Sequence, residues 1–80
     1  MDTHRLVKMA NDIANFFNSE PDHQVAVEGV AGHIRRFWDP RMRREIIQWL
    51  DSNNGEGLQP LALEALKANR DKLMPQARVS

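Results

Sequence analysis

A run of arginine and aromatic side chains between residues 33 and 44 carries most of the chain's potential chemistry. The run reads HIRRFWDPRMRR and contains five arginines, one aspartate, and the large aromatic residues Phe37 and Trp38. Arginine binds carboxylates through two parallel hydrogen bonds, and tryptophan buries a large area at low entropic cost. Both residue types are common anchors of protein interfaces, so the run indicates a docking surface for another protein.

The two aromatic residues of this run have a second interpretation, in which both are core residues and the arginines form a solvated face. Adjacent positions on a helix point about 100° apart, so the two rings need not face the same core. We expect at least one of them to lie at an interface. The candidate partner-binding surface, called the basic corner below, comprises Arg35, Arg36, Phe37, Trp38, Asp39, Pro40, Arg41, Met42, Arg43 and Arg44.

Nucleic acid is the competing partner for a basic stripe of this kind. Two helices around a short turn resemble a helix-turn-helix, whose second helix reads bases with exposed polar side chains. Arg41, Arg43, Arg44 and Gln48 could serve that purpose. The chain has no net charge, whereas nucleic-acid-binding domains are usually basic, so we predict no nucleic-acid partner.

Side chains suited to catalysis or to metal binding are scattered. His4, His23 and His33 lie on different segments, with no partner four residues away and no carboxylate at ligand spacing. No carboxylate sits in an apolar run that would raise its pKa for acid catalysis, and the chain has no cysteine. The sequence therefore predicts no catalytic, cofactor-binding or metal-binding residue, and no enzyme acting alone.

Length and composition limit the remaining possibilities. The chain has 80 residues, with eleven Lys and Arg against eleven Asp and Glu, and residues 33–44 alone carry a net charge of +4. A domain of this size has a small core, and without cysteine it has no disulfide to reinforce it, so a partner protein is the natural source of extra stability. The apolar runs are too short for a signal peptide or a membrane span, and we expect a soluble, cytoplasmic protein with no membrane partner.

The spacing of apolar residues predicts an all-α fold, a small bundle of three to four short helices. A first helix over about residues 3–18 has one apolar stripe, formed by Leu6, Met9, Ala10, Ile13, Phe16 and Phe17. A second helix runs from about Pro21 to Trp38, after a break at residues 19–22 that offers a hydroxyl cap and a proline. Its glycines, Gly29 and Gly32, suggest close packing against the first helix, with a ligand contact as the alternative.

A tight corner separates the second and third helices. Pro40 disfavours helical geometry at Asp39, which in turn can cap a new helix with proline at its first position. We expect the third helix to end near Asp51 and a fourth to begin at Pro60, where Gln59 is a poor cap and Leu58 can pack on Leu63. Residues 1–74 then form one helical domain and residues 75–80 a disordered tail.

The sequence resembles the small delta subunit of soluble, molybdenum- or tungsten-dependent, NAD-linked formate dehydrogenases. The most specific matching piece is HIRRFWDPRMR at residues 33–43. Further matches are MAN at residues 9–11, Ile13, FF at 16–17, GVA at 29–31 and, more weakly, GL, PL and AL between residues 57 and 66. The sequence departs from the family pattern at Gln59, where a better cap such as serine is expected, and after Leu66.

This resemblance implies a cofactor-free accessory subunit of a cytoplasmic complex that interconverts formate and carbon dioxide with NAD. In such a complex the larger subunits carry a bis-molybdopterin guanine dinucleotide centre, iron-sulfur clusters and FMN. Two roles remain open for the chain. It is either a permanent structural subunit that binds the catalytic subunit, or a maturation factor that assists insertion of the molybdenum cofactor with its arginines on phosphates.

Overall fold

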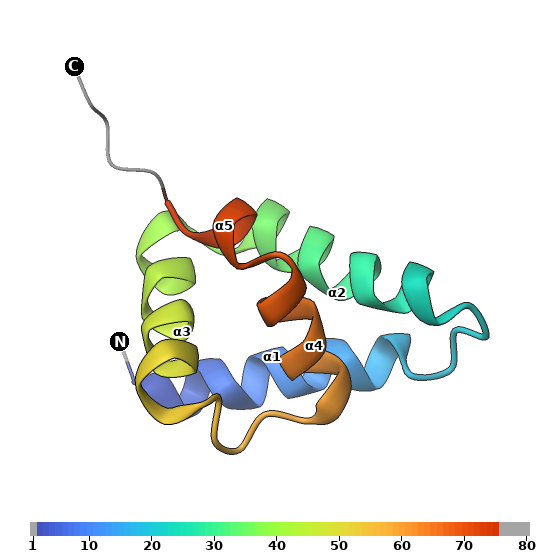
Figure 1. Cartoon of the computed structure of the whole chain (residues 1–80), viewed down its shortest axis with the longest axis horizontal. Helices are drawn as coiled ribbons and strands as arrows, with labels where there is room; N and C mark the ends of the chain where they lie inside the picture. Colours follow the sequence, from blue (N-terminus) through green and yellow to red (C-terminus); the bar gives the residue numbers. More distant parts are fainter. Residues whose placement is uncertain (1, 76–80) are drawn as a thin grey trace.

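The first two helices form an antiparallel hairpin. The computed structural model describes residues 2–75, and in it α1 spans Thr3–Phe17 and α2 spans His23–Phe37. The two helices run in opposite directions and are joined by residues 18–22 (Figure 1). The carboxylate of Asp22 caps α2 by accepting hydrogen bonds from the backbone N–H groups of Gln24 and Val25, at 3.0 and 3.3 Å. The predicted start near Pro21 was therefore about two residues early, because Asp22 is the cap.

The predicted corner between α2 and α3 is confirmed. Helix α3 spans Pro40–Asn53, with proline at its first position, and the Asp39 carboxylate accepts a hydrogen bond from the Met42 backbone N–H at 2.9 Å. Helix α3 lies across the end of the hairpin formed by α1 and α2 (Figure 1). It continues two residues past the predicted end at Asp51 and stops at Asn54, which adopts a left-handed conformation with φ 55° that asparagine tolerates.

Two short helices complete the fold. Helix α4 spans Pro60–Ala68 and packs against both α1 and α2, and the single turn α5 spans Arg70–Leu73 after an interruption at Asn69. Among residues 2–75 the structure therefore has five helices and no strand, which confirms the predicted all-α class. The predicted disordered tail falls mainly on residues 76–80, which lie outside the described part of the chain. No helix within residues 2–75 is long and apolar enough to cross a membrane.

The loop between α3 and α4 is held by side chains of other elements. The side-chain amide of Asn11, on α1, donates to the carbonyl of Gly57 at 2.9 Å and accepts from the backbone N–H of Gln59 at 2.8 Å. The indole N–H of Trp49, on α3, donates to the carbonyl of Glu56 at 2.9 Å. As predicted, the side chain of Gln59 makes no capping hydrogen bond, and Asn11 satisfies the backbone there instead.

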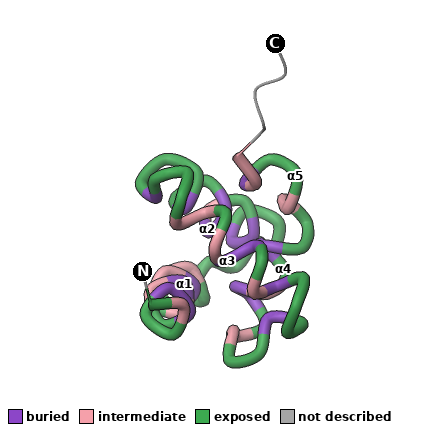
Figure 2. The backbone as a smooth tube through the Cα atoms, turned by 90° about the vertical axis from the view of Figure 1, so that its left-hand side faces the viewer, coloured by how far each residue is buried: buried purple, intermediate pink, exposed green. Residues whose placement is uncertain are grey.

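One hydrophobic core is shared by all five helices, and the buried residues lie mainly on the helix faces that meet inside the bundle (Figure 2). The largest fully buried side chains are Leu6, Val30, Ile34, Ile46, Ile47, Leu66 and Leu73. The prediction that Phe16 belongs to the core stripe is wrong, since its side chain is exposed. Phe17, which the predicted stripe also includes, packs against the core.

The two glycines of α2 differ in their surroundings. A Cβ atom added at Gly29 would collide with the ring of Phe17, whose Cδ1 would lie 2.7 Å away. The predicted close packing against α1 is therefore confirmed at Gly29. At Gly32 nothing lies within 4 Å of the same position, so packing does not require a glycine there.

Candidate partner-binding surface

The basic corner lies where the C-terminal turn of α2 meets the N-terminal turn of α3. Arg35 and Arg36 occupy the last turn of α2, where positive charge complements the negative end of the helix dipole. Arg41 lies in the first turn of α3, a turn that contains no acidic residue. Positive charge is unfavourable at that end of a helix, and only the capping carboxylate of Asp39 offsets it. Helix stability therefore favours the positive charge of Arg35 and Arg36 but not that of Arg41.

Four arginines of the basic corner are free to meet a partner. Arg35, Arg36, Arg41 and Arg44 are exposed, and within residues 2–75 none of them forms an ion pair. Arg41 and Arg44 line a shallow pocket of about 440 Å³ together with Asp39 and Pro40. A carboxylate of a partner could therefore reach two guanidinium groups at once.

Arg43, the fifth arginine, is tied to the fold. Its side chain is half-buried, and its guanidinium Nη1 donates to the carbonyl of Leu73 at the end of α5, at 3.4 Å. Its Nε atom is buried without a hydrogen-bond partner. Met42 is also half-buried and packs against the core. These two members of the basic corner therefore help position the surface, and the four exposed arginines present it.

The two aromatic residues of the basic corner lie in opposite environments. Trp38 is buried in the core, and Phe37 is exposed on the last residue of α2. The backbone leaves helical geometry at Trp38, which has φ −90° and ψ 136°. The backbone N–H of Trp38 still donates to the carbonyl of Ile34, at 3.0 Å. The core interpretation is therefore correct for Trp38, and only Phe37 is available to a partner.

The three histidines do not come together. The ring of His4 lies edge-on to Trp49 with 6.0 Å between centroids, and His23 Nε2 lies 2.7 Å from a carboxylate oxygen of Glu64. The ring of His33 lies against Phe37 with 4.7 Å between centroids. Within residues 2–75 no three His, Cys, Asp or Glu side chains are grouped so as to hold a metal ion. The side chains present therefore do not fit a molybdenum, iron-sulfur or other metal centre.

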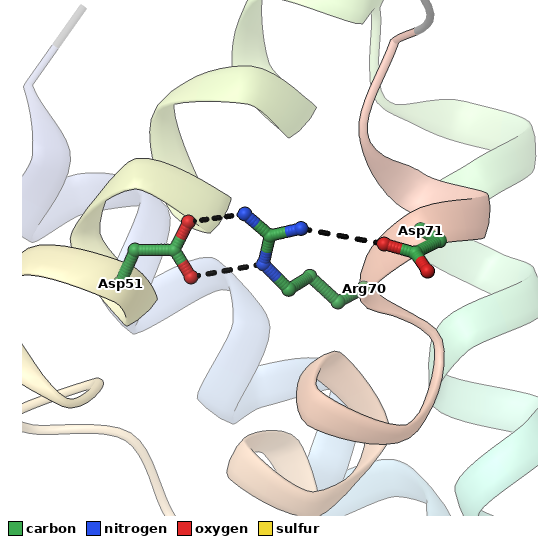
Figure 3. A network of polar contacts seen from close by, with 3 residues as sticks. All are labelled: Asp51, Arg70 and Asp71. Atoms are coloured by element: carbon green, nitrogen blue, oxygen red, sulfur yellow. Dashed lines mark hydrogen bonds and ion pairs between the residues drawn. The ribbon is translucent and has the colours of Figure 1, made fainter.

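A bidentate ion pair lies away from the basic corner. The guanidinium of Arg70 binds the carboxylate of Asp51 through Nε at 2.9 Å and Nη2 at 2.5 Å, and its Nη1 lies 3.3 Å from Asp71 (Figure 3). The hydrogen bonds from Arg70 lower the pKa of Asp51, and the carboxylate raises the pKa of Arg70. This contact joins α3 to α5, and so fixes the turn that accepts the hydrogen bond from Arg43.

Exposed apolar residues beside the basic corner were not foreseen from the sequence. The sequence predicts Phe16 in the core stripe of the first helix and assigns no site to His33. The structure places both beside a pocket of about 410 Å³ between α1 and α2. The adjacent pair Phe16 and Phe17 could have indicated this exposure, because two neighbouring helical residues cannot both face a narrow core stripe.

These features define a small helical bundle that presents a basic surface and, among residues 2–75, groups no metal-binding side chains. Residues 5–66 match the family model of the NADH-dependent formate dehydrogenase delta subunit FdsD. The chain therefore belongs to this delta subunit family, as its resemblance indicated, and the family is that of a subunit of an oxidoreductase complex. Searches of the curated proteins and of the solved structures returned no match.

Proposed function

We propose that this chain is a non-catalytic accessory subunit of a cytoplasmic NAD-dependent formate dehydrogenase, where it supports assembly or stability of the molybdopterin-containing catalytic subunit. The observation that carries the proposal is the set of four exposed arginines at the basic corner without ion pairs in the described chain. Membership of the delta subunit family supports the proposal, because the other subunits of a formate dehydrogenase are candidate partners for these arginines.

The redox chemistry of such a complex belongs to its larger subunits. Those subunits would carry the bis-molybdopterin guanine dinucleotide, the iron-sulfur clusters and FMN, and would use NAD. This chain has no cysteine, and so no thiolate to ligate an iron-sulfur cluster. Its contribution is therefore to binding and stability.

The surface that binds the basic corner should be acidic and partly apolar. Like charges repel one another in the free protein, and a partner with carboxylates at matching positions removes that repulsion. Bidentate contacts from Arg35, Arg36, Arg41 and Arg44 would fix the orientation of the docked chain, while Phe37 supplies apolar area. Such an interface forms quickly at low salt and weakens as ionic strength rises.

Charge reversal at the basic corner tests this proposal. The double variant Arg35→Glu/Arg36→Glu should weaken association with the catalytic subunit at least tenfold, with a smaller dependence on salt than the parent. Circular dichroism should show unchanged helix content, because both side chains are exposed. A matched control is Arg5→Glu/Lys67→Glu, which changes the net charge equally at exposed positions outside the basic corner. Parental affinity in the Arg35/Arg36 variant would show that the basic corner is only a solvated face.

A further inference from the structure

An apolar surface continues from the basic corner along the groove between α1 and α2. It consists of Ile13, Phe16 and Phe17 on α1 and of His33 and Phe37 on α2, and is called the aromatic strip below. Ile13, Phe16, Phe17 and His33 line one pocket of about 410 Å³ together with Asp12. The rings of Phe16 and Phe17 meet edge-on with 5.1 Å between centroids, and His33 connects this pocket to Phe37.

The exposure of the aromatic strip is unusual within this chain. Phe16 is 77% exposed and Phe37 is 70% exposed. In the part of the chain that the structure describes, the other exposed large apolar residue is Val25, at 49%. Single exposed apolar residues are ordinary. An exposed Phe16 that lines an apolar pocket, with an exposed Phe37 against the His33 ring of the same pocket, is typical of a surface that another molecule covers.

The charges around the aromatic strip restrict what can cover it. Asp12 is the carboxylate that lines the pocket, and it already contacts Lys8 at 3.3 Å. At the opposite end, Phe37 follows Arg36, which has no ion pair within residues 2–75. The uncompensated charge at that end is positive. A complementary surface is therefore apolar over Phe16 and acidic where it meets Arg36.

We infer that the aromatic strip and the basic corner form one continuous docking surface, and that an apolar, acid-edged segment of the formate dehydrogenase catalytic subunit covers both. This inference rests on the proposed function, which supplies that partner. Phe37 joins the two parts, because it belongs to the basic corner and its ring lies against His33 of the aromatic strip. The inference adds α1, through Phe16, to an interface that the sequence placed on α2 and α3 alone.

The aromatic strip is tested by Phe16→Ser/Phe37→Ser in the full chain, with binding to the purified catalytic subunit measured at low and high salt. We expect at least tenfold weaker binding at both salt concentrations, because apolar contacts are not screened. Val25→Ser is the matched control, since it removes an exposed apolar side chain of α2 outside the strip and should leave affinity unchanged. Phe16→Leu/Phe37→Leu should restore most of the affinity. Melting curves of the isolated variants should coincide with the parent.

Three results would overturn the inference, and they can be told apart. Parental affinity in the Phe16/Phe37 variant, with loss in the Arg35/Arg36 variant, removes the aromatic strip from the interface and leaves the proposed function intact. A parent chain that does not bind the catalytic subunit removes the proposed function as well. A parent chain that sediments as a dimer, while the Phe16/Phe37 variant is monomeric and keeps its affinity, assigns the strip to a second copy of this chain.

Discussion

Phe37 and Trp38 are adjacent in the chain, yet Phe37 is 70% exposed and Trp38 is 5% exposed. Phe37 is the last residue of α2, and the extended backbone at Trp38 turns the indole into the hydrophobic core. We therefore assign Trp38 to the stability of the fold and propose Phe37 for contact with a partner. Substitution can separate these two roles.

Trp38→Ala should destabilise the free chain by about 3–5 kcal/mol, the usual cost of removing a large aromatic side chain from a core. In a domain of this size that loss is enough to unfold much of the population. Phe37→Ala should change the free energy of unfolding by less than about 0.5 kcal/mol, since its ring is exposed. Urea unfolding followed by circular dichroism measures both values. Equal stabilities of the two variants would contradict the assignment of Trp38 to the core and of Phe37 to the surface.

The two glycines of α2 form a second matched pair. Gly32→Ala should stabilise the chain by up to about 1 kcal/mol, because alanine favours the helix and the space is open. Gly29→Ala should lower stability, since its methyl group would force the Phe17 ring out of its position. Thermal melting of both variants beside the parent is sufficient. A stabilised Gly29→Ala variant would show that the Phe17 contact is readily rearranged.

Asn11 is predicted to hold the loop between α3 and α4. Asn11→Ala removes both hydrogen bonds to the loop and leaves the backbone N–H of Gln59, at the start of α4, without its partner. We expect a loss of about 1–3 kcal/mol in the free energy of unfolding. Asn15→Ala is the control, because the side chain of Asn15 is exposed and its hydrogen bond within residues 2–75 is a long one, accepted from Asn18 at 3.5 Å. Hydrogen exchange at Gln59 should be faster in the Asn11 variant, and unchanged exchange would argue against the anchor.

The Arg70–Asp51 pair predicts a pH dependence of stability. Because Arg70 lowers the pKa of Asp51 in the folded chain, the carboxylate contributes stability above its unfolded pKa of about 4 and loses it as pH falls through the lower folded value. Asp51→Asn should therefore be less stable than the parent at pH 7, and the two should converge in acid. Both side chains are partly exposed, so the difference should shrink with salt.

Urea midpoints from pH 7 down to pH 2 measure this convergence. Asp71→Asn is the control, because Asp71 is 97% exposed and contacts Arg70 at one atom, so its curve should follow that of the parent. Parallel curves for the parent and Asp51→Asn across the whole range would show that the carboxylate contributes nothing through its charge.

The sequence predicted the helices well and their surfaces less well, for physical reasons. Asp39 and Pro40 define the corner by local geometry alone, so it could be placed from the sequence. The exposure of Phe16 could not be predicted from the sequence. Whether Phe16 or Phe17 faces the core depends on where α2 packs against α1. The inward position of Arg43 depends on the carbonyl of Leu73, thirty residues away in the sequence. Both features therefore depend on tertiary contacts with another helix, which local sequence patterns do not specify.

The most direct test of the account is purification of formate dehydrogenase from the native host through a tag on this chain. A permanent accessory subunit should remain with the active enzyme at a constant ratio to the catalytic subunit through successive columns, and the enzyme lacking it should melt at a lower temperature. A chain that separates from the active enzyme and is found only with cofactor-free catalytic subunit would contradict a permanent subunit and identify a maturation factor.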